Sequence, residues 1–305
     1  MEHSKIEYSV PTQWYEGLYQ DRTPCCSAAR PFRLCHDERS ADCWLLIHGY
    51  RGYPGELYRP AVDLFEAGWD VFVPRLPGHG TCGRDFARSG GEDWLGVIRN
   101  AIEDLKTKYG KVHLLGHSMG TAMAAILGVG DPAVGKIVYA CPSFENLQMT
   151  APARAVLKLL SPFTPKVRCK WHPSSKYHLH YENAPCDEAY LGREYFRWFF
   201  TKKLGEYYRI MKRGLGCIAA PHEHLVLCPM RDKVISVPST ALYRAAVGER
   251  ANVVCIETGT HCVFYDKDPA AEEQAVAAVL AFAEAEIIDN RYLCRRERAC
   301  KFAPR

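Results

Sequence analysis

The sequence predicts an α/β protein in which helices cover both faces of a mostly parallel sheet. From residue 43 onward, short apolar runs alternate with longer amphipathic segments, and this alternation is typical of consecutive β-α-β units. The apolar runs are almost uninterrupted, as expected for strands that are buried on both faces. The alternation stops near residue 141 and resumes near residue 217, which predicts an insertion into the sheet-forming core.

Local patterns place the expected elements in chain order. Glycines 68 and 110 follow segments whose apolar residues recur at helical spacing, so we expect them to end helices. The expected strands cover residues 43–48, 70–74, 111–115, 136–140, 224–228 and 252–257. The expected helices cover residues 56–67, 92–109, 118–127, 239–247 and 269–286. Before them, the segment RPFRLCHDERSA predicts the early antiparallel strands.

The insertion, residues 141–216, is about 75 residues long, far longer than an ordinary connection. It is punctuated by prolines and dense in tyrosine, phenylalanine and tryptophan. Insertions of this size are commonly lids or binding elements, and a purely structural excursion is the alternative. We therefore expect a core formed by residues 1–140 and 217–290, a helical cap at 141–216 and a basic C-terminal tail at 291–305.

Composition excludes several function classes. With 48% hydrophobic residues, 24% charged residues and a formal net charge of +4, the chain is an ordinary globular protein without the charge expected for binding nucleic acid. The basic residues of the tail are expected to be solvated, and a weak contact with an anionic surface is the alternative. The chain has no apolar run of signal-peptide or membrane-spanning length, so we expect a cytoplasmic protein without stable membrane insertion.

The fourteen cysteines do not form a recognisable metal or redox motif, because no Cys-x-x-Cys pair occurs. Several lie inside apolar segments, where a thiol behaves as a small hydrophobic group. We therefore expect no metal site, and a reducing compartment fits this cysteine usage best.

The segment VHLLGHSMGTAMAAIL, residues 112–127, carries the first candidate for chemistry, Ser118. An apolar strand precedes this serine and small helical residues follow it, as in the sharp turn that exposes a nucleophilic serine. Gly116 and Gly120 suit the turn because side chains there would crowd the strand against the helix. The first N–H groups of the following helix then face the serine, so we predict the backbone N–H of Met119 as one oxyanion donor.

A second oxyanion donor is expected from the loop after the strand at 43–48. In LLIHGYRG, Gly49 and Tyr50 directly follow this strand, and we assign the second donor to the Tyr50 backbone N–H. His48, at the strand end, is interpreted as a structural group, with a catalytic base as the alternative. His79 and His117 are interpreted in the same way.

The acid and the base are predicted after two later strands. Asp232 follows the strand in HLVLCPMRD, and His261 lies in the loop after the strand in NVVCIETGTH. A catalytic histidine needs a carboxylate that fixes its tautomer, and the order serine, acid, histidine is typical of this architecture. Glu145 is the alternative acid, whereas Asp266 and Asp268 are expected to cap the last helix. The remaining histidines after Ser118 do not follow a strand.

These segments together make the chain similar to the α/β-hydrolase superfamily. The similarity is strongest to the branch of bacterial carboxylesterases and monoacylglycerol lipases, which is sometimes grouped with serine aminopeptidase-like (S33) hydrolases. It rests on LLIHGYRG, GWDVFVPRLPGHG, EDWLGVI, VHLLGHSMG, LVLCPMRDKVIS and ETGTHCVFYDKD. The resemblance implies a catalytic triad of Ser118, Asp232 and His261, oxyanion donors at Tyr50 and Met119, and no cofactor. The insertion is longer, more basic and more aromatic than the compact caps of small esterases in this branch.

The sequence thus predicts a serine carboxylic-ester hydrolase that acts on a small-molecule ester with an apolar acyl or aryl group. A monoacylglycerol, a medium-chain ester and a hydroxycinnamoyl ester all fit. A thioesterase, an amidase or an acyltransferase could use the same triad, and a non-catalytic binding protein or receptor of this fold is the alternative from another class.

Overall fold

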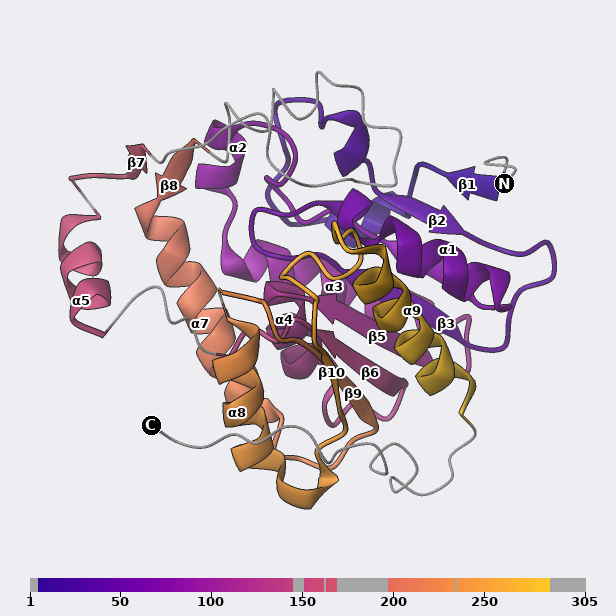
Figure 1. The fold of residues 1–305 in the computed structure, drawn as a ribbon. Coiled ribbons are helices and arrows are strands. Elements are labelled where there is room, and N and C mark those ends of the chain that lie inside the picture. The colour runs from indigo at the N-terminus through magenta and orange to yellow at the C-terminus, as the bar shows by residue number, and fades with distance from the viewer. Residues whose placement is uncertain (1–4, 145–150, 162, 169–196, 234, 286–305) are drawn as a thin grey trace.

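The computed structural model describes residues 5–144, 151–161, 163–168, 197–233 and 235–285. Their centre is an eight-stranded sheet in the order β1-β2-β4-β3-β5-β6-β9-β10, parallel except for the pairs that β2 forms with β1 and β4 (Figure 1). The strands are β1 (Ile6–Glu7), β2 (Phe32–Leu34), β3 (Cys43–Ile47), β4 (Asp70–Val73), β5 (Val112–His117), β6 (Val134–Ala140), β9 (His224–Pro229) and β10 (Val253–Ile256). The predicted α/β class and the early antiparallel strand are confirmed.

Helices cover both faces of this sheet, as predicted. One face carries α1 (Tyr58–Glu66) and α9 (Pro269–Glu284), which lie side by side in Figure 1. The other face carries α3 (Gly91–Leu105), α4 (Met119–Gly128), α7 (Thr201–Cys217) and α8 (Ser236–Val247). The short α2 (Gly83–Arg88) and the 3-10 turns η2 (Thr12–Tyr15), η3 (Ser27–Ala29), η4 (Pro54–Leu57) and η6 (Gly248–Arg250) join these elements.

The two hydrophobic cores follow from the alternation of side chains along each strand. In β3, Leu45 and Ile47 belong to the core beneath α3 and α4, whereas Trp44 and Leu46 belong to the core beneath α1 and α9. Successive side chains of a strand point to opposite faces, so a strand covered on both sides is apolar at every position. This is why the run at 43–47 is uninterrupted, and every one of its residues is buried.

One predicted helix differs at its start. The helix expected at 56–67 begins as the 3-10 turn η4 and becomes α-helical at Tyr58. Pro60 lies in the first turn of α1, where its missing N–H costs no helical hydrogen bond. The helix ends before Gly68, as predicted, because this glycine has a φ of 104°, which is unfavourable for other residues.

The N-terminal segment, which the sequence left largely unassigned, is attached to the core by buried polar contacts. The Asp85 carboxylate accepts hydrogen bonds from the Tyr19 hydroxyl at 2.8 Å and from the backbone N–H groups of Arg22 and Thr23 at 3.2 and 3.0 Å. The fully buried indole of Trp14 donates to Asp104 on α3 at 2.9 Å. Residues 5–42 therefore pack against the core rather than forming a separate unit.

Within the predicted cap, the structure describes α5 (Ala151–Leu160), the antiparallel pair β7 (Lys166–Arg168) and β8 (Trp198–Phe200), and α7. Helix α7 packs against α4, the helix that begins at the residue after Ser118. The division into core and cap stays a prediction, because residues 145–150, 162 and 169–196 lie outside the described residues, as does the basic tail at 291–305. In the described part of the chain, no helix is both long and apolar enough to span a bilayer.

The contact between α7 and α4 depends on Gly214. A Cβ atom at this position would lie 2.7 Å from Ala122 Cβ and 2.9 Å from the Ala122 carbonyl oxygen. We expect Gly214→Ala to lower the free energy of unfolding by about 1–3 kcal/mol, because the two helices must move apart. Urea denaturation measures this change.

The matched control is Gly205→Ala on the exposed side of the same helix, where a Cβ would meet no atom within 4 Å. This change should raise stability by up to about 1 kcal/mol, because alanine favours the helix more than glycine does. Equal effects of the two substitutions would contradict the close approach of α7 and α4.

Candidate active site

Ser118 lies at the sharp turn between β5 and α4. Its backbone has a φ of 53° and a ψ of −119°, a strained conformation for a residue other than glycine. Three glycines leave room for this turn. A Cβ at Gly116 would lie 2.5 Å from Thr121 N, one at Gly120 would lie 2.9 Å from the Ile47 carbonyl carbon, and one at Gly49 would lie 2.9 Å from Ser118 Cβ. The turn is therefore pressed against the end of β3, and side chains at these glycines would displace it.

The structure brings the three predicted triad residues together. His261 Nε2 lies 3.0 Å from Ser118 Oγ, and His261 Nδ1 lies 2.7 Å from Asp232 Oδ2. The three residues follow β5, β9 and β10, so they meet at the carboxyl edge of the parallel sheet. The Asp232 side chain is fully buried, whereas the His261 side chain is 25% exposed. An uncharged imidazole in this position can accept the serine proton at Nε2 while its Nδ1–H donates to the carboxylate.

The two predicted oxyanion donors belong to segments that adjoin Ser118. Met119 is the first residue of α4, so its backbone N–H has no partner within the helix. Tyr50 follows β3 in a loop closed by the bond from Gly52 N–H to the Gly49 carbonyl, at 3.0 Å. The Tyr50 ring stacks on Tyr207 of α7, with ring centroids 5.0 Å apart.

His48 joins two loops beside the candidate site and does not contact Ser118. Its Nδ1 donates to the Gly49 carbonyl at 3.0 Å, and its Nε2 accepts from the Leu76 backbone N–H at 3.1 Å. Both ring nitrogens are therefore occupied in the neutral form. The structural interpretation of His48 accounts for these contacts, and His79 is buried next to it.

His117 takes a position that the sequence did not indicate. Its Nε2 donates to the His261 main-chain carbonyl at 2.9 Å, so this side chain holds the loop that carries His261. Its Nδ1 lies 3.5 Å from Glu56 Oε2. The only sequence signal was its place next to Ser118, and the partner is 144 residues away.

A chain of hydrogen bonds that no local sequence pattern indicates runs from Ser118 to α7. The Thr121 hydroxyl donates to the Ser118 carbonyl at 2.6 Å and accepts from the Ser143 backbone N–H at 3.0 Å. The Ser143 hydroxyl lies 2.6 Å from the Tyr207 hydroxyl. Since Tyr207 also stacks on Tyr50, helix α7 contacts both sides of the candidate site.

The alternative acids have different surroundings. Asp268 caps α9, as predicted, and accepts from the Ala270 backbone N–H at 3.1 Å. The prediction that Asp266 caps the same helix is wrong: its Oδ2 accepts from the backbone N–H and the hydroxyl of Thr260, at 2.6 and 2.8 Å. Its Oδ1 accepts from the N–H of Asp268 at 3.1 Å, so Asp266 joins the loop before His261 to the N-cap residue of α9. Glu145 lies outside the described residues.

Residues 44–277 match the model of the alpha/beta hydrolase family. The chain belongs to this family. It is 32% identical over 119 residues to a thermostable monoacylglycerol lipase of Bacillus sp. (strain H-257) and 28% identical over 99 residues to a carboxylesterase of Bacillus subtilis (strain 168). These matches cover 39% and 32% of the chain, and 46% and 40% of the relatives, so the chain spans less than half the length of each.

Solved structures share the fold at low sequence identity. A structure reported for two metagenome-derived lipolytic enzymes has a TM-score of 0.69 at 19% identity and covers 85% of this chain and 98% of that chain. The monoacylglycerol lipase of Paleococcus ferrophilus has a TM-score of 0.65 at 18% identity, over 83% of this chain and 97% of that chain. The predicted α/β-hydrolase fold and the resemblance to its esterase and lipase branch are confirmed.

Buried histidines outside the candidate triad, among them His48, His113 and His224, make stability depend on pH. Burial lowers the pKa of His48, His113 and His224 to about 4. An unfolded histidine titrates near 6.5, so below this pH the unfolded chain binds more protons than the folded one. We expect stability to be fully present above pH 6.5 and to fall by about 1–2 kcal/mol per histidine between pH 7 and pH 5. Urea denaturation at the two pH values measures the loss.

His113→Asn tests the origin of this dependence. His113 Nδ1 accepts from the Lys136 backbone N–H at 2.9 Å, and an asparagine oxygen can take over this role without binding a proton. The variant should lose less stability than the wild type between pH 7 and pH 5. An unchanged loss would show that His113 is not held neutral by burial.

Proposed function

We propose that this chain is a serine carboxylic-ester hydrolase with Ser118 as nucleophile, His261 as general base and acid, and Asp232 as the group that orients the imidazole. One observation carries the proposal. Ser118 Oγ, the His261 ring and the Asp232 carboxylate form a continuous hydrogen-bonded line, with distances of 3.0 and 2.7 Å. Serine is a weak nucleophile unless a base of this kind takes its proton.

The proposed reaction proceeds through an acyl-enzyme. Ser118 Oγ attacks the ester carbonyl carbon while His261 Nε2 takes the hydroxyl proton. The tetrahedral intermediate then expels the alcohol, which receives that proton from His261, and an acyl ester of Ser118 remains. A water molecule, deprotonated by His261, attacks this ester, and His261 returns the proton to Ser118 Oγ as the acid leaves. Asp232 stabilises the imidazolium that forms in both halves of the reaction.

The Tyr50 and Met119 backbone N–H groups are the proposed donors to the oxyanion. Both are main-chain groups close to the serine, since Met119 begins α4 and Tyr50 lies next to Gly49, where the chain closely approaches Ser118. Donors that are already oriented need no reorganisation as negative charge develops on the carbonyl oxygen.

The proposed substrates are esters with an apolar acyl or aryl group. The Tyr50 ring adjoins the proposed oxyanion donor and packs against the rings of Tyr207 and Phe86, with centroid separations of 5.0 and 5.5 Å. The Phe86 ring in turn packs against Phe200, with centroids 5.2 Å apart. Aromatic surroundings favour apolar groups. Monoacylglycerols, medium-chain esters and hydroxycinnamoyl esters are the candidates. The names of the two Bacillus relatives, a monoacylglycerol lipase and a carboxylesterase, support this class.

Ser118→Ala tests the nucleophile. We expect ester hydrolysis to fall by at least about a thousandfold, because only substrate binding and the oxyanion donors would remain. A panel of chromogenic esters that vary in acyl length and aryl character gives kcat/KM, and a fluorophosphonate probe reports covalent labelling.

Ser9→Ala, at an exposed serine of the N-terminal segment, is the control and should keep activity and labelling. If the wild type hydrolyses no ester of the panel and takes up no probe, the proposal fails. Equal labelling of wild type and Ser118→Ala would place the nucleophile elsewhere.

Asp232→Asn tests the acid. The asparagine amide can donate a hydrogen bond to His261 Nδ1, which favours the tautomer with the proton on Nε2. In this tautomer Nε2 cannot accept the proton of Ser118. In serine proteases this change costs about ten-thousand-fold in kcat, and we expect a loss of similar order here. Steady-state kinetics on the best ester of the panel measures it.

Glu145→Gln is the matched variant, because Glu145 is the alternative acid from the sequence. We expect it to retain activity within about threefold, an effect well below that of losing a triad member. A larger loss of activity in Glu145→Gln than in Asp232→Asn would assign the role of the acid to Glu145 instead of Asp232.

A further inference from the structure

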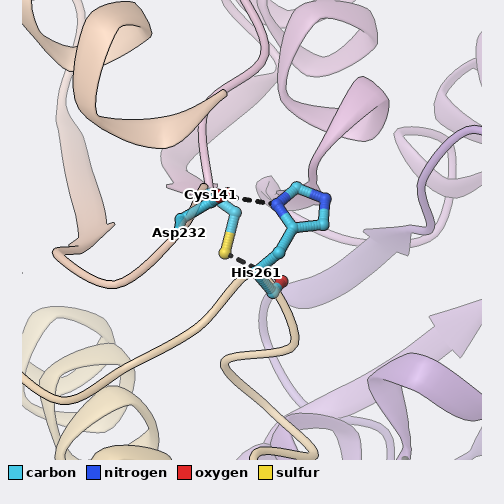
Figure 2. Close-up of side chains that lie close together, drawn as sticks. All are labelled: Cys141, Asp232 and His261. Carbon is cyan, nitrogen blue, oxygen red and sulfur yellow. Dashed lines mark hydrogen bonds and ion pairs between the residues drawn. The ribbon is translucent and has the colours of Figure 1, made fainter. Parts of the chain in front are cut away.

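Cys141 lies beside the proposed acid–base pair and has no role in the reaction described above. It follows the end of β6, and its Sγ donates to the His261 main-chain carbonyl at 3.3 Å. Figure 2 shows its sulfur close to Asp232 and His261. One ligand atom from each of the three side chains lies within 4.8 Å of the other two. Three segments far apart in the sequence thus place a thiol, a carboxylate and an imidazole in one cluster.

The main chain holds the Cys141 side chain in this position. Its backbone has a φ of 53°, and the only other non-glycine residues of the described chain with positive φ are Arg51 and Ser118. Its N–H donates to the Leu227 carbonyl at 3.1 Å, while the preceding carbonyl, that of Ala140, accepts from Ser118 N–H at 3.0 Å. Cys141 is fully buried, so its sulfur cannot turn away to solvent without a backbone change.

A thiolate, an imidazole and a carboxylate are the three donor types that bind Zn²⁺ in proteins, at about 2.0–2.3 Å from the metal. Ligand atoms around one tetrahedral ion are then roughly 3.3–3.7 Å apart. The cluster is already within 4.8 Å, so small side-chain movements would bring it to this spacing. The thiolate and the carboxylate also balance the two positive charges of the ion, which a buried site requires.

We propose that Cys141, Asp232 and His261 form an inhibitory site for a thiophilic divalent cation of the Zn²⁺ type. Binding forms bonds from the metal to Cys141 Sγ, to an Asp232 oxygen and to His261 Nδ1, with water in the fourth position. The Cys141 thiol releases one proton to solvent, while the proton of His261 moves from Nδ1 to Nε2 so that the ring stays neutral, and no electron transfer takes place. The partly exposed His261 ring gives the ion access to the cluster.

Inhibition follows from the loss of the hydrogen bond between His261 and Asp232. With the metal on Nδ1, the neutral ring carries its proton on Nε2, so Nε2 can no longer accept the proton of Ser118. This consequence rests on the proposed function, whereas binding of the ion does not. A hard cation such as Mg²⁺ prefers oxygen ligands and should not compete for the thiolate.

The first experiment compares Zn²⁺ inhibition of ester hydrolysis in wild type, Cys141→Ser and Cys43→Ser. Cys43 is equally buried but lies at the amino end of β3, away from the triad, so it controls for zinc bound by other cysteines. We expect Cys141→Ser to need at least about tenfold more Zn²⁺ for half inhibition, as is usual when a group that supports a metal site is lost. Cys43→Ser should match the wild type, and Mg²⁺ should inhibit none of them.

Equal sensitivity of Cys141→Ser and wild type to Zn²⁺ would overturn the proposal. Thermal melting verifies that each variant is folded, and Cys141→Ala replaces Cys141→Ser if the serine variant does not fold. The alanine variant has the same expected result, because it also lacks the sulfur ligand.

The second experiment measures binding without activity, using Co²⁺ as a spectroscopic substitute for Zn²⁺. Ser118→Ala should show a thiolate-to-cobalt charge-transfer band, and this band should be lost or weakened when Cys141→Ser is added. An unchanged band in the double variant would contradict the site. If the band depends on Cys141 while no ester is hydrolysed by the wild type, the metal site stands and the proposed function fails.

Discussion

The close approach of β3, β5 and α4 is the constraint on which the candidate site depends. Ser118 can take its strained turn only because the positions that face it carry no side chain, at Gly49, Gly116 and Gly120. The same contact brings the loop after β3 next to the serine and to the first residue of α4. A single packing requirement thus positions both the proposed nucleophile and its proposed oxyanion donors. A larger residue at any of these glycines would therefore displace the nucleophile and the donors together.

The parallel register of the sheet supplies the rest of the site. Strands β5, β9 and β10 all end at the same edge, so residues that follow them meet although they are far apart in sequence. Main-chain contacts then fix the position of His261, whose carbonyl accepts from both His117 and Cys141. The loop is therefore held from two sides while the ring stays partly exposed. This combination favours a base that is fixed in direction but accessible to substrate.

The buried chain from Ser118 through Thr121 and Ser143 to Tyr207 connects the turn to α7. Because Tyr207 also stacks on Tyr50, a movement of α7 would be felt both at the turn and at the loop after β3. Buried polar networks of this kind favour one arrangement, since breaking one bond leaves a polar group without a partner in an apolar region. The helix that the sequence assigned to the cap is thus part of the wall around the candidate site.

The sequence by itself determined the order of strands and helices, the glycines of the turn and the three residues of the proposed triad. Each of these follows from a local pattern: apolar runs, a glycine-flanked serine, and polar residues just past strand ends. The tertiary structure alone decided the contacts of Cys141, His117 and Tyr207, because their partners lie 120, 144 and 64 residues away. It also decided that Asp266 binds Thr260 instead of capping α9. Strand register and the left-handed backbone at Cys141 set these contacts, and neither leaves a local mark in the sequence.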